Sequence, residues 1–262
     1  MAFVFAFQPY RYTPAAGSLD DLVTEPYDKI SPAMREHYLA RSPYNLVRVI
    51  LGERFPADNG TNNVYTRAAR HLSDWIGSGV LARDAQPGFF AYFQEFAAPD
   101  TGERLVRKGF IGLGAVVNYA DKIVYRHEQT LSGPKKDRLE LLRHTHAHFG
   151  QIFMLYHDPS GAIDRLLDEA AAQPPAGEAT DGHGGIHRIW KISDPARNSE
   201  IARLMSDKKL LLADGHHRYE PALAFRDENR DLAGSDKAMM TFVNMHSPGL
   251  RILATHRLVS GL

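Results

Sequence analysis

Residues 211–220 read Leu-Leu-Ala-Asp-Gly-His-His-Arg-Tyr-Glu. The apolar run that ends at Ala213 predicts a strand covered on both faces, and helix-forming residues follow from Ala222 to Glu228. Gly215 therefore marks a tight turn from a strand into a helix. The first N–H groups of a helix have no intrahelical partner, and the positive end of the helix dipole lies there. We expect this turn, with the two histidines and the arginine behind it, to bind phosphate.

Pro221 fits this boundary, because proline is tolerated in the first turn of a helix and not deeper. A solvated surface is the alternative interpretation, with Asp214 as the helix N-cap and Arg218 paired with Glu220 or Asp227. A metal site is a further alternative, although adjacent histidines point apart on a helix. The residues predicted to bind phosphate here are Asp214, Gly215, His216, His217 and Arg218.

Composition limits the classes of function. The chain has 262 residues, of which 44% are hydrophobic, enough for a large core. A formal net charge of zero provides no overall field for nucleic acid or for an anionic membrane surface, so we expect neither as a partner. The absence of cysteine excludes disulfides and thiolate chemistry. The apolar opening of the chain is too short for a signal peptide, and no apolar stretch approaches a membrane span, so we expect a cytoplasmic protein.

The order of strands and helices predicts the fold class. Apolar runs predict strands at 3–7, 46–51, 89–96, 110–117, 123–125, 152–156, 186–192, 209–213, 239–245 and 250–254. Three- and four-residue spacing predicts helices at 33–40, 65–76, 137–148, 162–172, 195–205 and 221–229. The segment 173–185, rich in proline and glycine, predicts a mobile loop or linker. We expect a mixed α/β (α+β) protein with a mixed sheet and interspersed helices. It forms a single large domain or two closely packed lobes, approximately 1–125 and 126–262.

A second polar segment, residues 127–138, also follows a strand and precedes a helix. It is rich in hydroxyls and cations that suit phosphate. Its predicted phosphate-binding residues are His127, Thr130, Ser132, Lys135, Lys136 and Arg138. An ordinary basic helix start, with Asp137 in its first turn, is the alternative interpretation. His144 and His148 further along have the i and i+4 spacing of metal ligands on a helix, which leaves a metal site there as an alternative without an assigned acidic third ligand.

A third polar cluster lies at residues 24–32, where two carboxylates flank a proline in a turn. Asp28 is a candidate general base or ligand of a phosphate-bound metal ion. The alternative interpretation is equally good, since Asp28 and Ser31 in front of Pro32 also suit a turn and a helix N-cap.

These segments together resemble the bacterial and archaeal family known as domain of unknown function 1015. The resemblance rests on Pro26-Tyr27-Asp28-Lys29-Ile30-Ser31, Ser42-Pro43-Tyr44-Asn45, His127-Glu128-Gln129-Thr130, Lys135-Lys136-Asp137-Arg138, Ala213-Asp214-Gly215-His216-His217-Arg218-Tyr219, Asn244-Met245-His246 and Thr255-His256-Arg257. It runs through essentially the whole chain. The chain departs from the family at Glu25 and Ala254, where proline is expected. Members of the family extend further at the C-terminus, so we expect a C-terminal portion to be missing here.

A shorter resemblance carries the functional expectation. Residues 215–220 are similar to the glycine, histidine and arginine box of the ParB and sulfiredoxin superfamily, whose members bind nucleotide phosphates there. That superfamily includes free serine kinases, nucleotide-hydrolysing partition proteins and sulfinic acid reductases. The last activity requires a catalytic cysteine, which this chain lacks. The resemblance implies a ParB/sulfiredoxin-like element around the box.

We therefore expect a nucleotide-dependent phosphotransferase that acts on a small hydroxyl compound, free serine being the acceptor implied by the kinase branch. Phosphoryl transfer requires mainly positioning and charge neutralisation, which Lys135, Lys136 and Arg138 supply beside the Gly215 turn. The expected cofactors are Mg²⁺ and ATP or ADP.

The predicted catalytic residues are Asp28, Glu128 and His217, with one of the two carboxylates accepting the hydroxyl proton. Two alternatives stay open. One is a nucleotide-binding regulatory or interaction module without catalysis, and the other is a phosphate-ester hydrolase that uses the same cations.

Overall fold

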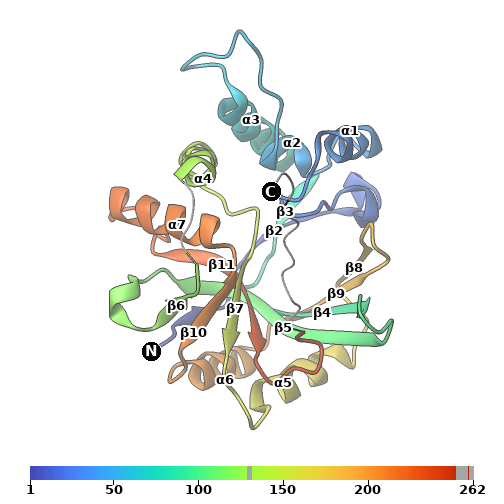
Figure 1. The fold of residues 1–262 in the computed structure, drawn as a ribbon, viewed down its shortest axis with the longest axis vertical. Helices are drawn as coiled ribbons and strands as arrows, with labels where there is room; N and C mark the ends of the chain where they lie inside the picture. The colour runs from blue at the N-terminus through green and yellow to red at the C-terminus, as the bar shows by residue number, and fades with distance from the viewer. Residues whose placement is uncertain (129–131, 252–258, 260–262) are drawn as a thin grey trace.

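The computed structural model describes residues 1–128, 132–251 and 259. Figure 1 shows the arrangement of the elements. The helices are α1 (Pro32–Arg41), α2 (Val47–Ile50), α3 (Val64–Gly77), α4 (Ser132–Thr145), α5 (Ala162–Ala171), α6 (Pro195–Met205) and α7 (His216–Glu228). The strands are β1 (Val4–Phe5), β2 (Tyr10–Tyr12), β3 (Leu81–Arg83), β4 (Phe89–Ala97), β5 (Arg104–Ala115), β6 (Val124–Arg126), β7 (Ile152–Tyr156), β8 (Gly177–Thr180), β9 (Ile186–Ile192), β10 (Leu210–Asp214) and β11 (Lys237–Asn244).

One large mixed sheet organises the fold, in the order β6-β10-β7-β11-β5-β4-β9-β8, with β1 added beside β5. The pairs β6/β10 and β7/β11 are parallel, and the other pairs are antiparallel. Strands from before and after residue 125 pair directly, as β5 does with β11. The prediction of a mixed α/β fold with interspersed helices is confirmed.

The two faces of this sheet have different neighbours. Side chains alternate between the faces of a strand. On one face, Phe110, Met154 and Phe242 are fully buried against α5 and α6, which lie below the sheet in Figure 1. On the other face, their neighbours Phe153 and Thr241 line a large cavity. The face that packs against α5 and α6 supplies most of the buried apolar surface. The opposite face, which borders the cavity, can therefore carry polar groups.

The helices α1, α2 and α3 lie above the cavity face in Figure 1 and have a smaller core of their own. Leu22, Val49 and Trp75 are buried there together with Leu141 of α4. Asn63 caps α3 through a reciprocal capping box with Thr66, an arrangement that satisfies backbone N–H groups at a helix start. This second core stabilises the packing of the helices that cover the cavity.

Two sequence predictions of secondary structure are wrong. Within the predicted strand 46–51, Val47–Ile50 form the short helix α2, because the Asn45 side chain accepts the Val47 N–H at 2.9 Å and starts a helical turn. A short buried apolar run has no periodicity that separates the two states. Within 173–185, residues 177–180 form β8 by pairing with β9, a contact no local pattern reveals. The strand predicted at 250–254 lies mainly outside the described residues.

In the part of the chain that the structure describes, no helix has both the length and the apolar character needed to cross a membrane.

Candidate functional site

The two polar segments predicted from the sequence lie side by side. Strands β6 and β10 are parallel neighbours, with Arg126 paired to Leu212. Each strand leads through a loop into a helix, β6 into α4 and β10 into α7. Parallel strands present their carboxyl ends at the same edge of a sheet, where ligand sites of such sheets lie. The sheet pairing therefore brings together two loops that are far apart in the sequence.

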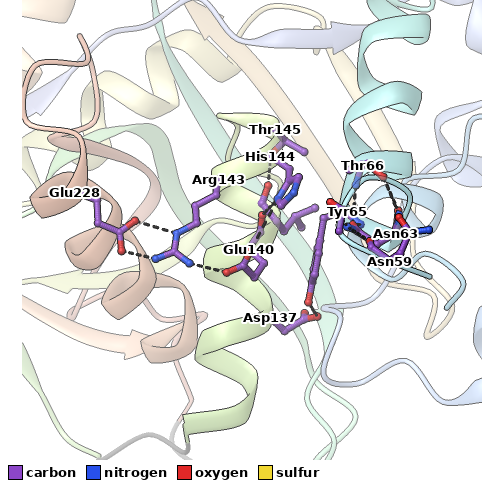
Figure 2. A network of polar contacts seen from close by, with 12 residues as sticks. Asn59, Asn63, Tyr65, Thr66, Asp137, Glu140, Arg143, His144, Thr145 and Glu228 are labelled. Carbon is purple, nitrogen blue, oxygen red and sulfur yellow. Dashed lines mark hydrogen bonds and ion pairs between the residues drawn. The ribbon is translucent and has the colours of Figure 1, made fainter. Parts of the chain in front are cut away.

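Two ion pairs join α4 and α7, one near the helix starts and one near the helix ends. Lys135 lies 2.9 Å from Glu220 near the helix starts, and Arg143 contacts both carboxylate oxygens of Glu228 near the helix ends. Both pairs join residues 85 positions apart, so the two helices run parallel in matched register. Figure 2 shows Arg143 of α4 reaching Glu228 on one side, while Asp137 of α4 meets Tyr65 of α3 on the other.

Gly215 shapes the turn into α7. Its φ of 94° lies in the left-handed region that favours glycine, and no described side chain caps the helix start. A Cβ atom at this position would lie 2.9 Å from Nη2 and 3.0 Å from Nε of Arg218. On its other side, a Cβ at Gly150 would lie 3.0 Å from the Cδ of Arg218. Two glycines therefore leave the space that the arginine side chain occupies.

The details of this turn correct two sequence interpretations. Asp214 does not cap the helix, and Arg218 pairs with Asp214 at 2.6 Å in place of Glu220 or Asp227. Pro221 is the sixth residue of α7, beyond the first turn that the sequence indicated. A proline there removes the bond that the His217 carbonyl would otherwise accept. The helix tolerates it because Pro221 is buried against the cavity, where packing compensates.

Three residues form a candidate metal centre at the junction of the two loops. Ligand atoms of His127, Glu128 and His216 lie within 4.8 Å of one another. The His127 Nδ1 contacts the Leu212 carbonyl at 2.9 Å, which leaves its Nε2 free to coordinate. His216 is buried, and its Nδ1 lies 2.9 Å from Glu128. Burial lowers the pKa of His216, against the opposing charge of Glu128, and this favours the neutral imidazole that a metal ligand must be.

Arg138 is held at the cavity by a network from three elements. It donates to Asp137 and to the carbonyl of Ile50, and its guanidinium lies 4.1 Å from the ring centroid of Tyr27. Burial alone would raise the pKa of Asp137, but Arg138 and Tyr65 outweigh it and hold that pKa below its usual value. Asp137 is therefore a carboxylate, and it fixes Arg138 in place.

A cavity of 1970 Å³ lies between the sheet and the helices. Of the residues predicted as site residues, His127, Arg138, Asp214 and Arg218 line it. Tyr27 lines it as well, and burial raises the pKa of its phenol against the lowering effect of Arg138 and Arg218. The three conspicuous segments of the sequence thus meet at one end of this cavity.

Other predicted residues lie outside the cavity lining. Asp28 is exposed in the turn before α1, where Ser31 caps the helix as the alternative interpretation had it. Lys136 is exposed and lines a separate pocket of 580 Å³. Lys135 is engaged by Glu220. His217 is half-buried, with an Nε2 atom that has no partner among the described residues.

Two further predicted residues belong to the loop before α4. Thr130 lies outside the described residues, and Ser132 is the first residue of α4. The helix therefore starts five residues earlier than the sequence indicated at Asp137, because the glycine and proline behind Ser132 fall in its first turn, where proline is tolerated.

Sequence reasoning missed the polar residues at the other end of the cavity. These are Tyr92 and Gln94 on β4, Arg107 on β5, Asp181 in the β8–β9 turn and His187 on β9, and all of them line the cavity. We refer to these five residues as the Arg107 cluster. They are scattered over 96 positions with no local motif, and the only available signal was a polar residue at cavity-facing positions of otherwise apolar strands.

Comparison with known proteins places the chain in a family without giving it an activity. No solved structure matches the chain. The family model described as "Protein of unknown function (DUF1015)" matches residues 4–262, so the chain belongs to that family, as its motifs indicated.

Proposed function

We propose that this protein transfers a phosphoryl group from a nucleotide, ATP or ADP, to a small hydroxyl compound, with free serine as the first acceptor to test. The observation that carries the proposal is the convergence of Arg138 of α4 and Arg218 of α7, two helices far apart in the sequence, on one end of a single cavity. Cations that converge on an enclosed site stabilise the charge of a transferring phosphoryl group.

The helix start beside these arginines supports the same role. Helix α7 has 13 residues and begins at an uncapped glycine turn, the arrangement in which backbone N–H groups and the helix dipole hold phosphate oxygens. Arg218 lies directly over this turn. In the proposal the Gly215 turn, with His216 and His217, cradles phosphates, and Arg138 neutralises the charge that develops during transfer.

Glu128 is the better of the two candidate bases. Both carboxylates are exposed and outside the cavity lining, but Glu128 lies in one cluster with His216 and with His127, which lines the cavity. In the proposed step the acceptor hydroxyl oxygen forms a bond to the terminal phosphorus, the bond from phosphorus to the bridging oxygen breaks, and the hydroxyl proton moves to Glu128. The nucleotide leaves shortened by one phosphate.

The same carboxylate fits the proposed Mg²⁺. Magnesium in phosphoryl-transfer sites is held by one or two carboxylates together with substrate phosphates, and Glu128 provides one. The imidazoles of His127 and His216 beside it suit Mn²⁺ or Zn²⁺ better than Mg²⁺. A bound cation would screen the negative charge on the phosphates, so we expect activity with Mn²⁺ as well as with Mg²⁺.

The test is direct. Purified protein is incubated with ATP or ADP, with Mg²⁺ or Mn²⁺, and with L-serine, and phosphoserine is measured by ³¹P NMR. We expect Arg218→Met to lower the rate by about 100-fold or more, since it removes a charge from the transferring group. Arg203→Met is the matched control, because Arg203 is exposed on α6 and pairs only with Glu200.

The outcomes separate the alternatives. Product formation that Arg218→Met does not affect would contradict the assigned site. Release of inorganic phosphate without an acceptor would indicate a hydrolase. Nucleotide binding without any turnover would indicate the regulatory module, and absence of nucleotide binding would exclude both the phosphotransferase and the regulatory module.

A further inference from the structure

Arg107 in β5 is the starting point, because its surroundings differ from those of the other arginines in the cavity. The guanidinium lies between two aromatic rings, 5.0 Å from the centroid of Phe96 and 5.7 Å from that of Phe153. Its two hydrogen bonds, to the Gly249 carbonyl and to Gln94, are both long at 3.4 Å. Within the described part of the chain, most of the five N–H donors of this arginine are therefore left without a good acceptor.

No described carboxylate compensates the charge of Arg107. It takes part in none of the ion pairs between described residues, and burial lowers the pKa of its guanidinium. Residues 129–131, 252–258 and 260–262 contain no aspartate or glutamate, so no acidic side chain of this chain remains to pair with it. A half-buried charge without a counterion is costly unless an anion binds there.

The neighbouring polar groups of the Arg107 cluster are already engaged with each other. Asp181 contacts Nε2 of His187 at 2.9 Å and also accepts the backbone N–H groups of His183 and Gly185. The His187 Nδ1 lies 2.7 Å from the Tyr92 hydroxyl. With the proton on Nε2 facing Asp181, the Tyr92 hydroxyl donates to Nδ1. This series of hydrogen bonds, from Tyr92 through His187 to Asp181, fixes Tyr92 beside Arg107. The guanidinium of Arg107 is then the group in the cluster with N–H donors available to a ligand.

Arg107 shares its cavity with the proposed phosphate site. Its guanidinium extends over Phe153 of β7, and Phe153 is paired in register with Asp214. Strands β10 and β5 are three strand spacings apart, about 14 Å, and Arg107 lies four residues along β5 from Ile111, the residue in the row of Phe153 and Asp214. The reach of the Arg107 guanidinium to the Phe153 ring bridges much of this separation. A small molecule held at Arg107 can therefore present a hydroxyl group toward the phosphate end.

We infer that Arg107 binds the carboxylate of the acceptor, so the acceptor is a small hydroxy acid or hydroxy amino acid. The planar guanidinium matches the two oxygens of one carboxylate. Among the described residues, the Arg107 cluster contains no second arginine or lysine and no helix start, which a dianionic phosphate group would require. The assignment of the bound carboxylate to the acceptor rests on the proposed function. The carboxylate-binding site itself is argued from the contacts of Arg107 alone.

The experiment compares compounds that differ by the carboxylate alone. Calorimetry measures binding of L-serine and D-glycerate, and of ethanolamine and ethylene glycol, which lack the carboxylate. A panel of two- to four-carbon hydroxy acids extends the series. We expect the carboxylates to bind about tenfold or more tightly than their decarboxylated partners. Arg107→Met should abolish that difference, Arg107→Lys should restore part of it, and neither should change the affinity for ATP.

Arg104→Met is the matched control, because Arg104 is exposed on the same strand and pairs with Glu95. Circular dichroism checks that each variant is folded. Equal binding of the two series, or no binding by any carboxylate, overturns the inference. Weaker ATP binding by Arg107→Met with unchanged carboxylate binding also overturns it, since Arg107 would then contact phosphate. Carboxylate binding without phosphoryl transfer would contradict the proposed function and leave the carboxylate site standing.

Discussion

The two ends of the cavity handle positive charge in opposite ways. At the end lined by Arg138 and Arg218, where we propose that phosphate binds, Arg138 is paired with Asp137 and Arg218 with Asp214. At the other end, Arg107 has two long hydrogen bonds and no described carboxylate. Paired arginines are held in position by the protein whether or not a ligand is bound. An unpaired arginine depends on its ligand for a counterion.

This difference indicates how the two ends contribute to folding and to binding. Removing a paired arginine leaves a carboxylate without its partner, so it costs stability. Removing an unpaired arginine leaves no charge behind, so its cost falls on ligand binding. The predictions below test this contrast.

The largest effect on stability is expected for Arg138→Met. Its side chain is 11% exposed and holds Asp137. We expect a loss of about 2 kcal/mol in the free energy of unfolding, less than for a fully stranded buried charge, because Asp137 keeps Arg54 and Tyr65 as partners. Urea unfolding measures it. A loss below about 0.5 kcal/mol would mean that the pair does not stabilise the fold, as for many surface pairs.

The next effect is expected for Gly215→Ala. The left-handed φ and the contact of the new Cβ with the Arg218 guanidinium both oppose the substitution. We expect a loss of about 1 to 2 kcal/mol together with weaker nucleotide binding. Gly133→Ala is the control, because a Cβ atom at Gly133 would meet no atom within 4 Å and the φ there is not left-handed. A Gly215→Ala protein as stable as the wild type would show that the turn is not constrained.

A pH effect should follow from His148, which lines the cavity. Burial lowers the pKa of His148 below its ordinary 6.5, so the unfolded chain takes up a proton more readily than the folded one. Its stabilising contribution is therefore complete above pH 6.5 and is lost as the pH falls through the folded pKa. In thermal unfolding between pH 7.5 and 5, His148→Gln should reduce this loss. The control variant is His183→Gln, at a position 83% exposed.

The smallest effect on stability is expected for Arg107→Met. Methionine keeps apolar contact with Phe96 and Phe153, and no described carboxylate loses a partner. We expect the free energy of unfolding to change by less than about 0.5 kcal/mol, in contrast to Arg138→Met. A loss as large as that of Arg138→Met would remove the distinction between the two ends of the cavity.

The segments that hold Arg138 and Arg218 could be selected from the sequence because the polar residues of each segment are contiguous. A strand, a glycine and a polar helix start form a local pattern, so the residues around Gly215 and Arg138 could be selected one segment at a time. That the two segments meet depends on the pairing of β6 with β10. Parallel pairing is non-local, and the sequence contains no local signal for it.

The other end could not be predicted for the same reason. Arg107 and His187 are single polar residues within strands, and each is an ordinary surface residue by pattern alone. Only the antiparallel pairing of β4 with β5 and β9 brings them together. Likewise, the apolar run at 46–51 predicted a strand, and the Asn45 side chain that starts a helix there had no distinguishing signal.

The parallel arrangement of α4 and α7 has an electrostatic consequence. Two parallel helices that start side by side place the positive ends of their dipoles next to each other, about half an elementary charge each. These ends repel, and the pairs Lys135–Glu220 and Arg143–Glu228 hold the helices together against that repulsion. An anion seated between the helix starts would turn the repulsion into attraction on both sides. The melting temperature of the protein should therefore rise with the concentration of any anion that occupies this position.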